Sequence, residues 1–152
     1  MHIKSYKLEK VLKKMVVTKY ITLKTLGETD IINITSETQD ALGESNAKNG
    51  VVTVFVPGAT GGLTTVEYEP GLVSDLKALF ERLAPKKAAY SHDEKWSDGN
   101  GYSHVRASLL GPSITVPFSE GKLMLGTWQQ IIFIDFDNRP RSRELVIQII
   151  GE

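Results

Sequence analysis

Two of the chain's three histidines, His92 and His104, lie in one polar segment with carboxylate side chains beside them. The segment contains Tyr90-Ser-His-Asp-Glu94 and continues to Asn100-Gly-Tyr-Ser-His104. Imidazole and carboxylate together suit a cation such as zinc, and imidazole also suits proton transfer near neutral pH. The spacing of the two histidines matches no compact metal motif, and no HExxH helix is present. The residues alone therefore leave a solvated pair and a site equally open.

A glycine-rich bend, Pro57-Gly-Ala-Thr-Gly-Gly62, interrupts the chain after an apolar run and continues into Thr64 and Thr65. Glycines allow backbone N–H groups to approach an anion, and threonine hydroxyls add donors. The bend is neither a Walker loop nor a GxGxxG turn, so a tight structural turn is the favoured interpretation. Glu67 follows soon after, and if it faces inward its carboxylate needs a partner or a role.

A second bend lies in Arg106-Ala-Ser-Leu-Leu-Gly-Pro-Ser113, where Gly-Pro is expected to place Ser108 and Ser113 near one another. Arg106 suits a phosphate or carboxylate ligand if it points into a cleft, and a surface helix cation is an equally good interpretation.

Gly126 lies in an otherwise apolar predicted strand, directly before Thr127, Trp128 and Gln129. A glycine there indicates a bulge or a close approach by a ligand or another backbone. Trp128 can wall a pocket for a flat ring, although a core tryptophan is the commoner situation.

Periodicity predicts the elements that position these residues. Residues 51–56 are nearly all apolar, which predicts a central strand covered on both faces. Residues 86–103 have no apolar period and are expected to form a long loop, either functional or disordered. The predicted strands are 15–25, 31–35, 51–56, 113–118, 122–136 and 143–150. The predicted helices are 37–47, which follows an N-cap at Ser36, a second helix that begins at residue 70 or 71 and is stopped by Pro85, and 104–110. Strands with interspersed helices predict an α+β fold with a largely antiparallel sheet.

Composition excludes several classes of protein. A chain of 152 residues predicts one domain. The absence of cysteine excludes a disulfide scaffold, a cysteine nucleophile and a thiolate metal site, and it fits a reducing cytoplasm. No apolar run is long enough to span a membrane, and the first residues do not resemble a signal peptide. The formal net charge of zero argues against a nucleic-acid partner.

Lysines are concentrated near the start of the chain: seven of them precede residue 25, against the single Glu9. Such a stretch can contact phosphate or an acidic patch on another subunit, although a solvated strand face or a frayed terminus is the favoured interpretation. His2 is interpreted as a terminal residue without a role.

Taken together and in this order, these segments resemble the YjbQ-like family, which is described as secondary thiamine-phosphate synthases. The most specific blocks are Ala107-Ser-Leu-Leu-Gly-Pro-Ser113 and Leu125-Gly-Thr-Trp-Gln129. The other resembling segments are 54–71, 90–94, 104–113 and 135–141.

The resemblance implies an α+β domain, single over residues 1–152, with its mixed, largely antiparallel sheet curved into a half-barrel with two main helices. It also implies a cytoplasmic homotrimer, and a transferase that joins a pyrimidine pyrophosphate to a thiazole phosphate with release of pyrophosphate. That reaction requires neutralisation of the departing charge, normally by Mg²⁺ and by cationic or N–H donors.

Site residues follow from the same resemblance, with Glu67, Arg106 and Ser108 added from the arguments above. The catalytic candidates are His92, His104 and Glu67, which are expected to border a phosphate-accepting cleft. His92, His104 and Glu94 are the candidate ligands of a divalent metal, Mg²⁺ or Zn²⁺. The candidate substrate-binding residues are Gly61, Thr64, Thr65, Arg106, Ser108, Ser113, Trp128 and Gln129.

One departure affects the mechanism. Many members of the family have a histidine where this chain has Gly58, so a three-histidine zinc site within one subunit would need His2. Glu67 is a candidate replacement. Two alternatives remain open: a metal- or histidine-dependent enzyme acting on another small phosphorylated metabolite, and a non-catalytic metabolite-binding trimer.

Overall fold

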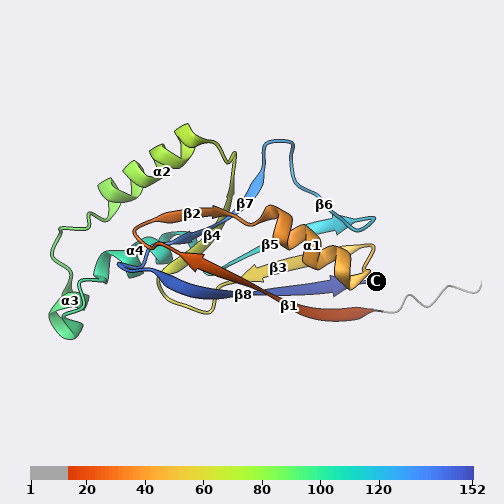
Figure 1. Ribbon diagram of the computed structural model, residues 1–152, viewed down its shortest axis with the longest axis horizontal. Helices are drawn as coiled ribbons and strands as arrows, with labels where there is room; N and C mark the ends of the chain where they lie inside the picture. Colours follow the sequence, from red (N-terminus) through yellow and green to blue (C-terminus); the bar gives the residue numbers. More distant parts are fainter. Residues whose placement is uncertain (1–13) are drawn as a thin grey trace, which may run out of the picture.

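The computed structural model describes residues 14–152 (Figure 1). The chain forms two antiparallel sheets, one with the strand order β1-β8-β3-β5-β6 and one with the order β2-β7-β4. The β-structure curls into a half-barrel, as the resemblance implies, and residues 14–152 contain four helices rather than two main ones. The elements are β1 (Met15–Thr25), β2 (Asp30–Asn33), α1 (Thr35–Ser45), β3 (Gly50–Phe55), β4 (Gly61–Val66), α2 (Pro70–Leu83), α3 (Ser91–Trp96), α4 (Gly101–Leu110), β5 (Ser113–Ser119), β6 (Lys122–Leu123), β7 (Gln130–Asp135) and β8 (Arg141–Gly151).

Two apolar clusters lie on opposite faces of the three-stranded sheet. The larger cluster joins the inner face of the five-stranded sheet to α1 and to one face of β7 through Ile131 and Phe133. The smaller cluster joins the other face of β7, through Ile132 and Ile134, to α2 and α4. Strand β7 is therefore buried on both faces.

The double burial predicted for residues 51–56 is wrong for β3. Strand β3 is central in its sheet, and its inward residues Val52 and Val54 are fully buried. Its other face is open, since Val51 and Phe55 are 37% and 40% exposed. The apolar residues on this open face explain why residues 51–56 are nearly all apolar. The strand that is covered on both faces is β7.

Helix boundaries differ from the prediction for identifiable reasons. Helix α1 begins at Thr35 rather than after Ser36, because Asn33 Oδ1 accepts hydrogen bonds from the backbone N–H and the hydroxyl of Thr35. It ends at Ser45, and the next residue, Asn46, adopts the left-handed conformation that terminates helices. Helix α2 begins where the sequence predicts, with Pro70 in its first turn and the Glu69 carboxylate accepting the N–H of Gly71.

The prediction was wrong or incomplete in three other regions. The glycine bend leads directly into β4, a strand that the sequence did not predict. The single strand expected over 122–136 is divided into β6 and β7 by a connection at 124–129 (Figure 1). The stretch 86–103 is not one loop, because it contains α3 and the first residues of α4.

No helix in the described part of the chain has the length and apolar character needed to cross a membrane. His2 and Glu9 and most of the N-terminal lysines lie outside the described residues, so the predictions made for them stay open.

Candidate functional site

Helix α4 is fixed by the polar residues on its inward face. Ser103 Oγ donates to the Phe136 carbonyl at 2.5 Å, and Tyr102 is fully buried. This anchoring leaves His104 and Ser108, one helical turn apart, on a side of the helix that borders a pocket.

The pocket has a volume of about 350 Å³ and lies between α4 and the glycine bend. Three of the predicted site residues, Gly61, His104 and Ser108, line it together. The other lining residues are Gly58, Ala59, Ala107, Gly111 and Pro112. The fold therefore brings the bend before β4, the histidine of α4 and the Gly-Pro bend to one cavity.

The two glycines at the start of β4 serve packing. A Cβ on Gly61 would lie 2.7 Å from the Phe133 ring, and a Cβ on Gly62 would lie 2.9 Å from Leu110 Cβ. Since real Cβ atoms are not found so close, both positions require glycine for β4 to pack closely against Phe133 of β7 and Leu110 of α4. This supports the structural interpretation of Gly61 and Gly62, while Gly58 and Ala59 stay exposed at the pocket.

His92 on α3 stacks against His104 on α4, with the two ring centroids 4.4 Å apart and the ring planes inclined by 34°. The connection between the two helices is tight. Asp93 Oδ1 accepts the Gly101 N–H at 2.8 Å, and a Cβ on Gly101 would lie 2.5 Å from Tyr90 Cβ. Two histidines separated in the sequence are thus held in contact.

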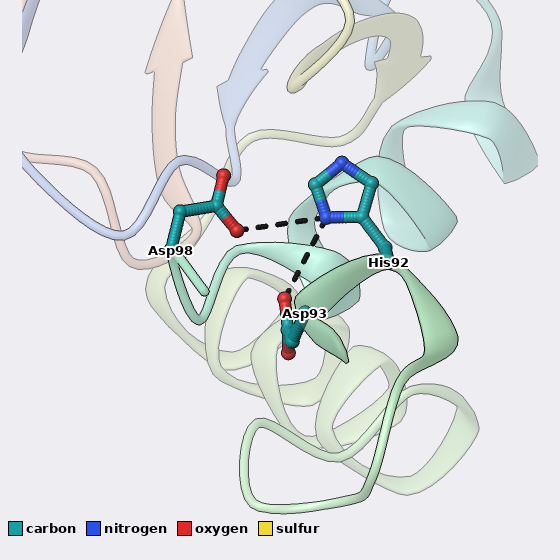
Figure 2. A group of neighbouring side chains, drawn as sticks. All are labelled: His92, Asp93 and Asp98. Carbon is teal, nitrogen blue, oxygen red and sulfur yellow. Dashed lines mark ion pairs between the residues drawn. The ribbon is translucent and has the colours of Figure 1, made fainter. Parts of the chain in front are cut away.

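His92, Asp93 and Asp98 form a group whose ligand atoms lie within 4.8 Å of one another (Figure 2). His92 Nδ1 lies 3.6 Å from Asp93 Oδ1 and 3.5 Å from Asp98 Oδ1. The nitrogen is buried and has no hydrogen-bond partner within the described residues. An imidazole nitrogen and two carboxylates form a donor set that fits a divalent cation.

The predicted metal ligands only partly coincide with this group. His92 belongs to it, and His104 adjoins it through the stacked ring. Glu94 is exposed on α3 and does not belong to it. Asp93 and Asp98 occupy the place expected of Glu94, because Asp98 lies in the short connection after α3 and turns back towards His92 (Figure 2).

Arg106 does not point into the pocket. The residue is 4% exposed, and its guanidinium stacks on the Tyr102 ring and donates to the Ala84 carbonyl, Thr29 Oγ1 and Glu81. Neither interpretation from the sequence, ligand or surface cation, describes it. Arg106 faces inward, where it joins α4 to the end of α2 and to the turn before β2.

The remaining predicted residues lie away from the pocket lining. Glu67 does not face inward: it is exposed just after β4 ends at Val66. Trp128 is 69% exposed, so it is not a core tryptophan. Gln129 Nε2 donates to Thr65 Oγ1 at 3.0 Å, which ties the connection before β7 to β4. Thr64 is half-buried on β4, and Ser113 is exposed at the start of β5.

A buried charge network, which the sequence analysis did not single out, lies beside the glycine bend. Asp135, fully buried at the end of β7, accepts Nε and Nη2 of Arg143 at 2.8 and 2.7 Å. Arg143 Nη2 also donates to Thr60 Oγ1 at 2.7 Å. Asp137 pairs with Arg141 at 2.9 Å. The available signal was a charged residue at every second position from 135 to 143, two aspartates followed by three arginines.

The network shifts the pKa values of its members. The hydrogen bond to Asp135 raises the pKa of Arg143 above its ordinary value, against the effect of burial. Burial by itself raises the pKa of Asp137, but hydrogen bonds from Arg141 and Thr60 and the charges of both arginines hold that pKa below its ordinary value of 3.8. Both groups therefore stay charged at neutral pH.

Fold and pocket define a small α+β half-barrel protein with a histidine-bordered cavity. Residues 19–152 match the family model described as UPF0047 protein YjbQ-like. A UPF0047 protein of Archaeoglobus fulgidus is 38% identical over 130 residues, covering 86% of this chain and 98% of that protein. The UPF0047 protein YugU of Bacillus subtilis is 32% identical over 135 residues, covering 88% of this chain and 98% of YugU.

Solved structures agree with this assignment. A YbjQ-like protein of unknown function from Sulfolobus solfataricus superposes with a TM-score of 0.87 at 28% identity, covering 92% of this chain and all of that one. A YjbQ/UPF0047 protein from Clostridium acetobutylicum has a TM-score of 0.79 at 36% identity, covering 86% of this chain and 98% of that one. The chain belongs to the YjbQ-like UPF0047 family, which confirms the predicted resemblance and fold class.

Proposed function

We propose that this chain is an enzyme acting on a small phosphorylated metabolite, with a reaction of the thiamine-phosphate synthase type. The observation that carries the proposal is the contact between His92 and His104 at a pocket whose opposite wall is the glycine bend. Functional sites of enzymes commonly combine a concave pocket with converging titratable groups.

In the proposed reaction, a ring nitrogen of the thiazole phosphate attacks the methylene carbon of the pyrimidine pyrophosphate. The carbon–oxygen bond breaks, and its electron pair leaves with pyrophosphate. Catalysis then consists mainly of stabilising charge on the leaving group. His104, which lines the pocket, is the proposed N–H donor to that group, and the Ser108 hydroxyl is the proposed second contact.

A divalent cation, Mg²⁺ or Zn²⁺, is part of the proposal. Its support is the donor set of His92, Asp93 and Asp98 together with the buried His92 Nδ1, which has no partner among residues 14–152. When bound, such a cation neutralises anionic oxygen. His92 has the additional role of holding His104 in place by ring stacking.

The size of the pocket favours a second candidate of the same chemical class. Small-molecule sites usually occupy about 300–1,000 Å³, and this pocket, at about 350 Å³, is near the lower limit. A single phosphorylated metabolite fits that volume more readily than two substrates together. Hydrolysis of one phosphorylated metabolite is therefore the alternative reaction for the same residues.

We also propose that the chain assembles with copies of itself in the cytoplasm. The support for assembly is the outer face of the five-stranded sheet, where Val16, Ile150 and Val51 are direct cross-strand partners and are 67%, 50% and 37% exposed. Tyr20 and Phe55, 61% and 40% exposed, lie in a second such row. Exposed apolar patches of this kind commonly mark interfaces. A homotrimer is the assembly implied by the family, and sedimentation at micromolar concentration tests it: a monomer would contradict it.

The test of function is incubation of the protein with the two thiamine precursors and Mg²⁺. We expect thiamine phosphate to form, and to fall by at least about 100-fold in His104→Ala, since single catalytic proton donors contribute about 10²–10⁴-fold. Glu94→Gln, an exposed change on the neighbouring helix, is the matched control and should retain activity. Product that is unaffected by His92→Ala and His104→Ala would identify a contaminant. Binding without turnover would favour a metabolite-binding protein.

A further inference from the structure

We propose that Arg143 binds an anionic group, phosphate or pyrophosphate, at the glycine bend, where Gly58 leaves one edge of the guanidinium uncovered. The inference rests on the proposed function and deepens it, because it assigns the charged end of the metabolite to a residue outside the predicted site.

Arg143 is held in a fixed orientation by three hydrogen bonds. Nε and Nη2 donate to the two oxygens of Asp135 at 2.8 and 2.7 Å, and Nη2 also donates to Thr60 Oγ1 at 2.7 Å. The remaining nitrogen, Nη1, donates to none of the residues 14–152. The side chain is 13% exposed. One edge of the planar group is thus used for anchoring and the other is free.

Gly58 controls access to that free edge. A Cβ built on Gly58 would lie 3.2 Å from Arg143 Nη1, which is tighter than an ordinary contact. Any side chain at position 58 would therefore cover the nitrogen. Because residue 58 is glycine and is exposed, Nη1 lies next to open space at the bend.

The bend connects this space to the pocket. Gly58 and Ala59 line the pocket, whose other side carries His104 and Ser108. The backbone N–H of Ala59 finds no backbone acceptor within residues 14–152. Nη1 and this N–H are both donors, so the group that meets them must supply acceptors.

Arginine has donors and no acceptor, and its planar fork matches the oxygens of phosphate or carboxylate. The nearby charges already balance, since Asp135 and Asp137 face Arg141 and Arg143. A bound anion is therefore held by directed hydrogen bonds rather than by excess positive charge. We expect millimolar to micromolar affinity for the isolated anion.

The experiment is a titration of the full chain with inorganic phosphate and with pyrophosphate, followed by NMR of the arginine Nε–H signals and the Ala59 amide. We expect saturable shifts of the Arg143 and Ala59 signals. Gly58→Val, which covers Nη1 and leaves the Asp135 pair intact, should weaken binding at least about tenfold. Gly43→Ala is the matched control, because a Cβ there meets nothing within 4 Å, and it should bind as the unmodified chain does.

Gly58→Ala provides the same test if Gly58→Val does not fold, since its single added carbon already reaches the 3.2 Å contact. Unchanged affinity in a folded Gly58 variant, or shifts that miss Arg143 and Ala59, would overturn the inference and leave water as the partner of Nη1. His92→Ala separates the two proposals: it should abolish turnover and leave phosphate binding unchanged. If turnover depends on His92 but phosphate binding is unaffected by substitution of Gly58, the proposed function stands and the anion site at Arg143 does not.

Discussion

Asp135 and His92 both lie in charged clusters near the pocket, and their surroundings differ in one decisive respect. Asp135 is fully buried and accepts four hydrogen bonds, from Thr25, Asp137 N–H and two nitrogens of Arg143. His92 Nδ1 is buried between two carboxylates at 3.5 and 3.6 Å and has no hydrogen bond to any described residue. A polar group that finds its hydrogen-bond partners within the chain stabilises the fold, whereas a buried polar group without a partner is suited to binding a ligand.

The largest expected effect is on the fully hydrogen-bonded Asp135. Asp135→Ala leaves the Arg143 guanidinium buried without its carboxylate, and breaking a buried pair in this way costs about 3–5 kcal/mol. Urea unfolding should show this loss in the free energy of unfolding. Glu144→Ala, an exposed change on the same strand β8, should stay within about 0.5 kcal/mol. An equal, small effect of both substitutions would remove the distinction between the two clusters.

A second prediction addresses the open cluster. His92→Ala should lower the affinity for Zn²⁺ at least about 100-fold, because loss of a direct ligand costs no less than the 10–100-fold typical of its supporting residues. The free energy of unfolding should change by only about 1 kcal/mol, since the nitrogen makes no hydrogen bond within residues 14–152 and the main loss is the stacking on His104. Calorimetric metal titration measures the first quantity. Glu94→Gln should bind Zn²⁺ normally, and unchanged affinity in His92→Ala would contradict the ligand assignment.

Gly101→Ala sharpens the comparison by disturbing the open cluster without replacing any of its ligands, although the added Cβ would also lie 3.1 Å from Asp93 Oδ1. The added Cβ would lie 2.5 Å from Tyr90 Cβ, so α3 must shift away from α4. Overpacking of this kind costs about 1–3 kcal/mol, and we expect a roughly tenfold weaker Zn²⁺ affinity as the ligands separate. Gly43→Ala again serves as the control. Full metal affinity in Gly101→Ala would mean that the ligands do not depend on the contact between the two helices.

The smallest expected effect is on the stability of the fold at acidic pH. Because the folded pKa of Asp137 is held below its ordinary value of 3.8, this residue stabilises the fold fully above that pH. Its contribution is lost as the pH falls from that value through the folded pKa. The free energy of unfolding should therefore decrease on acidification in this range, and Asp137→Asn should show a shallower decrease. Identical slopes for both proteins would exclude a stabilising role of the Asp137 charge.

Strand alternation and helical periodicity predicted β1 and α2 because both signals are local. Strand β4 escaped prediction because Gly61 and Gly62 suggest a turn, and only the distances to Phe133 and Leu110 show why a strand requires them. The two histidines were found by residue type, but their contact depends on the packing of α3 on α4. Arg106 and Asp135 were misjudged or missed because burial of a charged residue depends on partners that are distant in the sequence.

Strand β7 has neighbouring strands on both sides and apolar layers above and below. Its amide protons are therefore protected from exchange by local fluctuations, and they should exchange with deuterium only when the entire chain unfolds. Amides of the six-residue helix α3, which has no buried residue, should exchange through local fluctuations instead. One exchange experiment on the same sample then provides two measurements. The exchange rates of β7 report the global unfolding equilibrium, and those of α3 report whether a cation is bound beside His92.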